Sequence, residues 1–263
     1  MMEILDRNIK DLINQYPSMG KALDDFNIAC TTCNVGTCKL KDIVEIHNLS
    51  EIDERALFMK IAGIVYPGKT VEIPHLPRKA AAAGAKKKFS PPMQMLVDEH
   101  KHIKRVIAAI PDLVESVKSS LPENRKTVEQ VIDFIRNYAD RFHHAKEEDI
   151  LFKQFEPATD IIKVMLEEHK IGRGHVKEVL AGLELNDANR IAANLSAYGA
   201  LLTEHIFKED EILYPWMERN MSDSQIGRLY SDFLSVEESF DGSPQRLVAF
   251  AESLTLNKIQ EVL

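Results

Sequence analysis

The stretch His143-His-Ala-Lys-Glu-Glu-Asp-Ile-Leu-Phe152 is repeated later in the chain as His205-Ile-Phe-Lys-Glu-Asp-Glu-Ile-Leu-Tyr214. A shorter repeat precedes each copy, because Met95-Leu-Val-Asp-Glu-His100 resembles Met165-Leu-Glu-Glu-His169. The order along the chain is therefore a single histidine, a His-x3-Glu pair, and then the same two elements again. This order determines how the rest of the sequence is interpreted.

Each element of the repeat falls on a different long amphipathic segment. Apolar residues recur at helical spacing through segments of about 92–119, 125–155, 158–184 and 187–219. The breaks between them are short, and short connections between long helices imply antiparallel neighbours. No segment alternates with period two. The sequence therefore predicts an all-α fold built around an up-down-up-down four-helix bundle.

The segments on either side of the bundle have a different character. Residues 1–66 predict a small helical, cysteine-containing domain, and proline together with an Ala/Lys-rich stretch predicts a linker over 67–91. The bundle domain is expected over 92–240, including a weaker helix at about 222–239, and residues 241–263 are expected to form a C-terminal helix. Packing on the bundle and a homodimer contact both stay open as roles for these last helices.

Composition excludes several classes of function. A chain of 263 residues with 44% hydrophobic content can bury a core, and its net charge of -8 argues against general nucleic-acid binding. Apolar runs are far shorter than the roughly 20 residues that cross a bilayer, and no signal-peptide pattern opens the chain. Three cysteines argue against a disulfide scaffold. We expect a soluble cytoplasmic protein with no nucleic-acid or membrane partner.

The spacing of the repeat suits a metal centre. A His and a carboxylate at i and i+4 are neighbours on one helix face, so both can reach one cation. His143 with Glu147 shares a face with apolar residues, whereas His144 shares one with Asp133, Asn137 and Asp140, which reads as solvent-facing. The sequence therefore predicts these inward-facing metal ligands: His100, His143, Glu147, His169, His205 and Glu209.

The alternative to a metal site is a set of hydrogen-bonded core residues. A single histidine on an apolar face is usually of that kind. Glutamate differs, because an unpaired buried carboxylate is costly. Two buried glutamates and four buried histidines on four helices need a common compensating charge, which a cation supplies. Two carboxylates between two metals is the arrangement of di-iron sites in helix bundles, and mixed N/O donors suit iron or manganese.

Residues from about 92 to 240 resemble a hemerythrin-like (HHE cation-binding) domain, on the paired His-x3-Glu-x2-Ile-Leu-Phe/Tyr signature. The resemblance implies two iron ions with an oxo or hydroxo bridge, held by the six residues above. Oxygen-carrying hemerythrins have a fifth histidine one turn after the His of the third helix, and Arg173 stands at that place here. The set of four His and two Glu is closer to the repair-of-iron-centres proteins, whose N-terminal domain resembles residues 1–66. That family protects or rebuilds iron–sulfur clusters after nitric-oxide or oxidative damage.

All three cysteines lie in one short run, Cys30-Thr-Thr-Cys33-Asn-Val-Gly-Thr-Cys38. In a reducing compartment a C-x2-C-x4-C run is typical of redox or metal-binding thiols. Three thiolates can hold a second metal ion or part of an iron–sulfur cluster if a fourth ligand, for which His47 is one candidate, comes from elsewhere. Reduced thiols in a surface loop are the alternative.

Three functional hypotheses follow. The first is a di-iron protein of stress protection that acts on iron–sulfur proteins. The second is a module that binds or senses oxygen. The third is a di-iron enzyme acting on peroxide or nitric oxide, for which Tyr138 and Tyr198 are candidates to assist. The sequence leaves open whether the protein is an enzyme.

Overall fold

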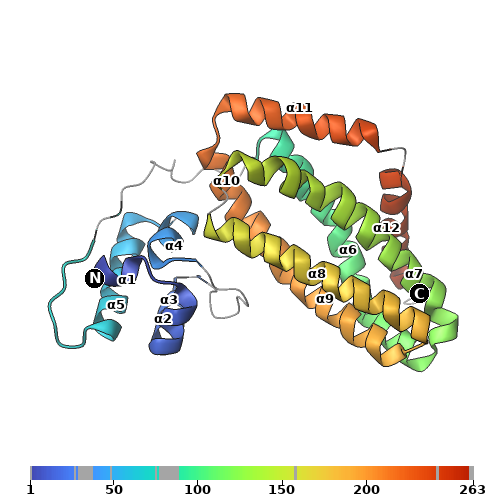
Figure 1. The fold of residues 1–263 in the computed structure, drawn as a ribbon, viewed down its shortest axis with the longest axis horizontal. Coiled ribbons are helices and arrows are strands. Elements are labelled where there is room, and N and C mark those ends of the chain that lie inside the picture. Colours follow the sequence, from blue (N-terminus) through green and yellow to red (C-terminus); the bar gives the residue numbers. More distant parts are fainter. Residues whose placement is uncertain are drawn as a thin grey trace. The chain divides into compact units, whose positions relative to one another are not determined.

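The computed structural model describes residues 2–26, 28, 38–47, 49–74, 76, 89–156, 159–240 and 243–260 (Figure 1). Every named element in these ranges is helical, and the β-type pairing found there is an isolated bridge between Asn8 and Lys39. The predicted all-α fold is confirmed. None of the helices described combines the length and the apolar character needed to cross a membrane.

Chain contacts divide the molecule into two compact units. One contains Met1–Lys88, Ala158–Val164 and Ile212–Asn220, and the other contains Phe89–Pro157, Met165–Glu211 and Met221–Leu263. All of the predicted bundle ligands belong to the second unit.

The N-terminal part of the first unit is a cluster of short helices. Its elements are α1 (Met2–Leu5), α2 (Ile9–Gln15), α3 (Ser18–Asp24), α4 (Leu40–Ile46) and α5 (Glu51–Val65). Fully buried side chains such as Leu12, Met19 and Phe58 hold them together. The helix α1 was not expected from the sequence. Cys30, Cys33 and most of the predicted linker lie outside the described residues.

Four long helical rods carry the predicted bundle ligands. Their elements are α6 (Pro91–Ser119); α7 (Leu121–Phe134) continuing through η1 (Ile135–His144), η2 (Glu147–Leu151) and η3 (Phe152–Gln154); α8 (Asp160–Leu185); and α9 (Ala188–Lys208) continuing through η4 (Glu209–Leu213) and α10 (Tyr214–Asn220). Single-residue Ser120 and the pair Asn186–Asp187 turn the chain between neighbouring rods. Asn186 has a φ of 54°, a left-handed conformation that asparagine tolerates at a helix end.

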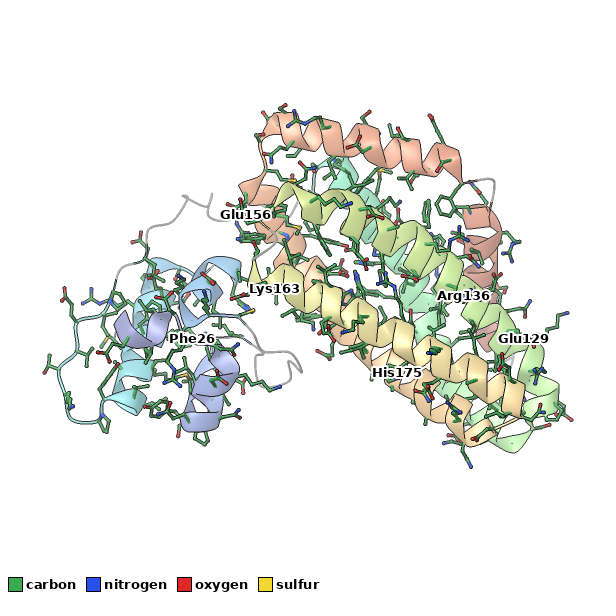
Figure 2. All side chains as sticks on the ribbon, in the orientation of Figure 1. Phe26, Glu129, Arg136, Glu156, Lys163 and His175 are labelled. Atoms are coloured by element: carbon green, nitrogen blue, oxygen red, sulfur yellow. The ribbon has the colours of Figure 1, made fainter. Side chains whose placement is uncertain are left out.

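Apolar stripes on the rods face one another and form the core. Four side chains of these stripes are fully buried, as their helical spacing requires: Val117, Val128, Ile191 and Leu195. The space between the rods is filled by side chains (Figure 2). The rods therefore fix the positions of any polar residues that interrupt the stripes.

The two C-terminal helices pack on the bundle. They are α11 (Asp223–Ser239) and α12 (Ser243–Gln260), and both contact α6. Leu247 and Ala251 of α12 are buried in the bundle core, and Phe233 of α11 is fully buried. The structure shows the packing on the bundle, and the homodimer contact stays a prediction.

The rods that carry the His-x3-Glu pairs contain wide turns of π-helix at η1, η2 and η4. The backbone N–H of Ala145 donates to Asp140 and that of Phe152 donates to Glu147, each five residues earlier. Such turns are rare and occur frequently at functional sites. They also shift the helical register, so that a face extrapolated at 3.6 residues per turn no longer holds beyond them.

The close approach of α8 and α9 yields a stability prediction. A Cβ at Gly182 would lie 2.7 Å from Cγ1 of buried Ile191 and 3.3 Å from the carbonyl oxygen of Asp187. We expect Gly182→Ala to lower the free energy of unfolding by about 1–3 kcal/mol, measured by chemical denaturation, because neither neighbour can move freely.

Gly174 on the same helix is the matched control. A Cβ there meets nothing within 4 Å, so Gly174→Ala should stabilise the protein by up to about 1 kcal/mol through helix propensity. Equal effects of the two substitutions would contradict the close packing of α8 against α9.

Candidate metal centre

The structure brings the six predicted ligands together inside the bundle. None of the six side chains is more than 2% exposed, which is unusual for histidine and glutamate. The six are His100, His143, Glu147, His169, His205 and Glu209. Each of the four rods contributes at least one of them, as the repeat predicts. Buried charges of this kind need partners.

The first pair of imidazoles comes from α6 and η1. Nε2 of His100 lies 2.9 Å from Nε2 of His143. Oε2 of Glu209 lies 3.3 Å from the same nitrogen of His100. Two ring nitrogens and a carboxylate oxygen thus meet at one point.

The second pair comes from α8 and α9 and repeats this geometry. Nε2 of His169 lies 2.9 Å from Nε2 of His205, and Oε1 of Glu209 lies 2.9 Å from Nε2 of His205. Oε2 of Glu147 lies 3.5 Å from Nε2 of His169 and 3.8 Å from Nε2 of His143. Both glutamates therefore lie between the two imidazole pairs.

The other ring nitrogen of each histidine is held by a carboxylate outside the six. The Nδ1-to-oxygen distances are 2.7 or 2.8 Å in all four cases: His100 with Asp210, His143 with Glu99, His169 with Glu148, and His205 with Glu168. A carboxylate accepts hydrogen bonds, so Nδ1 carries the proton and donates it. In the neutral ring Nε2 is then an unprotonated lone pair directed inward, the tautomer that metal-binding histidines adopt.

Two lysines support the outer carboxylates in the same pattern. Lys146 donates to Oε1 of Glu99 and Lys208 donates to Oε1 of Glu168. Lys146 is 0% exposed, and its ammonium lies 3.8 Å from the ring centroid of Phe142. Sequence analysis did not assign these residues a role. The signal was in the repeat, where a glutamate precedes each single histidine and a lysine precedes each ligand glutamate.

This set of nitrogen and oxygen ligand atoms fits a cation. Four inward lone pairs face carboxylate oxygens, and neither oxygen of Glu209 accepts a hydrogen bond of good geometry despite contacts of 2.9 and 3.3 Å. Acceptors that face acceptors repel unless a positive charge lies between them. Two nitrogens that bind one cation at about 2.1 Å and at right angles lie about 3.0 Å apart. The observed separation of 2.9 Å in each pair matches this value.

Electrostatics of the metal-free site agree with this interpretation. Burial lowers the pKa of His143 and of His169 well below the usual value, so both rings are neutral. Burial also opposes charge on Glu209 and His205, but their mutual attraction outweighs it. The pKa of Glu209 lies well below its usual range, and that of His205 rises to about 9. A bound cation would take the place of the proton on His205.

His144 differs from its expected position. The sequence places it on a solvent face, but it is only 6% exposed, and its ring stacks on His169 with centroids 3.9 Å apart. The cause is the π-helical winding of η1, which turns His144 inward relative to Asp133 and Asn137. A ring nitrogen of His144 lies within 4.8 Å of ligand atoms of Glu147, His169 and His205.

Arg173 stands where the resemblance places a fifth histidine in oxygen carriers. Its guanidinium donates to Asp140 at 2.8 Å and to Glu148 at 2.7 Å. Glu148 in turn accepts the Nδ1 proton of His169. Arg173 therefore supports a ligand through its carboxylate partner, since a guanidinium cannot itself bind a cation.

A cavity of about 320 Å³ adjoins this part of the site. Its walls are mostly apolar and include Leu180, Tyr198 and Leu202, and it reaches His144 and His169. Burial raises the pKa of Tyr198, so its hydroxyl stays protonated. Tyr138, the other tyrosine singled out, is buried beside Phe134 and Phe142 and does not line the cavity.

The predicted cysteine site receives no structural test. Cys30 and Cys33 lie outside the described residues, and Cys38 is half-buried. Burial lowers the pKa of His47 to about 4, so this ring is neutral. Among the residues that the structure describes, the clusters able to hold a metal ion lie in the bundle and include neither Cys38 nor His47.

The support of His205 by Glu168 can be tested directly. We expect Glu168→Gln to lower metal affinity about 10- to 100-fold, because the amide supports the ligand tautomer less well and breaks the ion pair with Lys208. Competition with a chelator measures the change. Glu167→Gln, next in sequence and paired with exposed Lys170, should leave the affinity unchanged. A similar loss in both variants would refute a specific role for Glu168.

The comparisons with known proteins agree with the geometry. Among curated proteins and among solved structures, no significant match to this chain is found. A family match nevertheless covers the bundle and, together with the buried His/Glu cluster, indicates a metal-binding site. Residues 92–217 match the family model described as the Hemerythrin HHE cation binding domain.

Proposed function

We propose that the bundle holds two iron ions. His100 and His143 would bind one, His169 and His205 the other, and Glu147 and Glu209 would bind both. The observation that carries this proposal is the placement of Glu209, whose Oε2 faces His100 at 3.3 Å while its Oε1 faces His205 at 2.9 Å. Each oxygen of one carboxylate thus serves a different imidazole pair.

The donor set favours iron. Every ligand is an imidazole nitrogen or a carboxylate oxygen, and no thiolate is among the clustered groups of the described chain. Such mixed N/O sets suit iron or manganese, whereas soft thiolates select zinc and copper(I). When bound, paired iron supplies electron exchange and open positions for a small molecule. The chain's own residues fix the tautomer and the orientation of the imidazoles and bury the carboxylates.

The proposed role is protection or rebuilding of iron–sulfur clusters under nitric-oxide or oxidative stress, with iron–sulfur proteins as partners. Its support is the resemblance of both halves of the chain to the repair-of-iron-centres proteins, together with the run Cys30, Cys33 and Cys38. In this proposal the bundle stores iron or reacts with a small molecule, and the thiols relay iron or electrons to the acceptor. The proposal places the protein in the cytoplasm, where these thiols stay reduced.

A second candidate is a di-iron enzyme acting on nitric oxide, peroxide or oxygen. The cavity of about 320 Å³ that reaches His144 and His169 favours it, because it provides a route for a small molecule. Reversible oxygen carriage is less well supported, since Arg173 replaces the fifth histidine and is engaged with Asp140 and Glu148.

Replacing one carboxylate oxygen tests the iron proposal. We expect two irons per chain in the wild type and fewer than one in Glu209→Gln, because the amide removes the charge that both cations share. Metal analysis of anaerobically loaded protein gives the stoichiometry, and circular dichroism checks that the helices persist. Glu211→Gln, two residues on and exposed, should retain two irons. Retention of two irons by Glu209→Gln would disprove the shared carboxylate.

The repair role has its own test. We expect the double variant Cys30→Ser/Cys33→Ser to keep its bundle iron but to lose transfer of iron to an apo iron–sulfur acceptor protein, since serine does not offer a thiolate. Thr31→Ala/Thr32→Ala, between the two cysteines in sequence, is the control and should transfer normally. Unchanged transfer in the cysteine variant would exclude the relay, and turnover of many equivalents of peroxide or nitric oxide would favour the enzyme.

A further inference from the structure

We propose that His144 is a seventh protein ligand, which binds the cation held by His169 and His205. This inference rests on the proposed two-iron centre and deepens it. It makes the two metal positions unequal, with three imidazoles on one and two on the other.

The placement of His144 is the first argument. The six other ligands repeat between the two halves of the chain, but the residue after His205 is Ile206, so His144 has no counterpart in the second half. Its ring is buried and lies nearly parallel to that of His169, at an interplanar angle of 14°. One of its nitrogens falls within 4.8 Å of ligand atoms of Glu147, His169 and His205. The opposite cluster, of His100, His143 and Glu209, has no such third imidazole among the described residues.

The outer side of the His144 ring is the second argument. Its Nδ1 lies 3.8 Å from Oδ1 of Asp140, and Arg173 holds that carboxylate in place. Each of the other four histidines also has a carboxylate at its Nδ1, but at 2.7 or 2.8 Å. A distance of 3.8 Å exceeds a hydrogen bond, so Asp140 does not fix this ring as the other carboxylates fix theirs. An imidazole lone pair lies in the plane of its ring, so in this proposal His144 turns out of its stack on His169 for both rings to bind one cation.

The cavity gives this ligand a consequence. His144 and His169 both line the space of about 320 Å³ beside the site. A small molecule in this cavity contacts both His144 and His169. With His144 bound, the nearer cation offers one open position fewer than the cation of His100 and His143. The geometry therefore points to His144 as the residue that decides which cation an entering molecule can reach.

Mössbauer spectra of the full chain, loaded with two irons, test the inference. Two unequal iron environments give two quadrupole doublets of equal area in the wild type. His144→Phe keeps an aromatic ring for stacking on His169 but has no nitrogen, so one doublet should shift while the other stays. His175→Phe is the control. His175, which is labelled in Figure 2, lies on the same bundle, and its Nδ1 is 3.0 Å from Oδ1 of Asn194. Its replacement should shift neither doublet.

A second variant separates loss of a ligand from loss of packing. In His144→Ala, one doublet should shift and should return toward the wild-type position when imidazole is added. Two irons with an unchanged spectrum in both His144 variants would overturn the inference while leaving the proposed function intact. Failure of the wild type to take up two irons would instead overturn the proposed function itself.

Discussion

Repulsion between buried electron pairs is the constraint on which this structure depends. Four imidazole nitrogens and two carboxylates converge where their side chains are almost fully buried, and the carboxylates and every neutral imidazole among them present acceptors. An uncompensated carboxylate in such surroundings costs several kcal/mol, more than the net stability that one domain can spare. The chain itself answers this in part, because attraction between Glu209 and His205 lowers the pKa of the glutamate and raises that of the histidine. A pair of cations answers it for all six groups at once.

The outer groups prepare the inner ones for that role. Each Nδ1 is bonded to a carboxylate, and two of these carboxylates, Glu99 and Glu168, are themselves held by buried or half-buried lysines. From the centre outward, each imidazole therefore bonds a carboxylate, and the carboxylates of Glu99 and Glu168 each bond an ammonium group. Such an arrangement fixes tautomer and ring direction before any ion arrives, so little reorganisation accompanies binding.

Helical periodicity was sufficient to predict the bundle, and the repeat was sufficient to predict that six polar residues converge inside it, because the elements of the repeat fall on four different rods. It failed at His144, where the π-helical turns of η1 rotate the chain by less per residue than a period of 3.6 assumes. The roles of Glu99 and Glu168 were also missed. Each follows from contact with a histidine on the neighbouring rod, and the spacing within one helix does not report such a contact. The cysteine run stays a prediction, since Cys30 and Cys33 lie outside the described residues.

The two repeated parts of the site differ in how far their lysines are exposed to solvent. Lys146 is fully enclosed, with Phe233 of α11 at 5.7 Å and Glu237 at 3.5 Å, whereas the side chain of Lys208 is 17% exposed. The same chemical unit is thus placed in two dielectric surroundings, and the surroundings of a metal site tune its reduction potential. If two irons bind as proposed, their reduction potentials would therefore differ. Helix α11, which covers Lys146, would contribute to that difference.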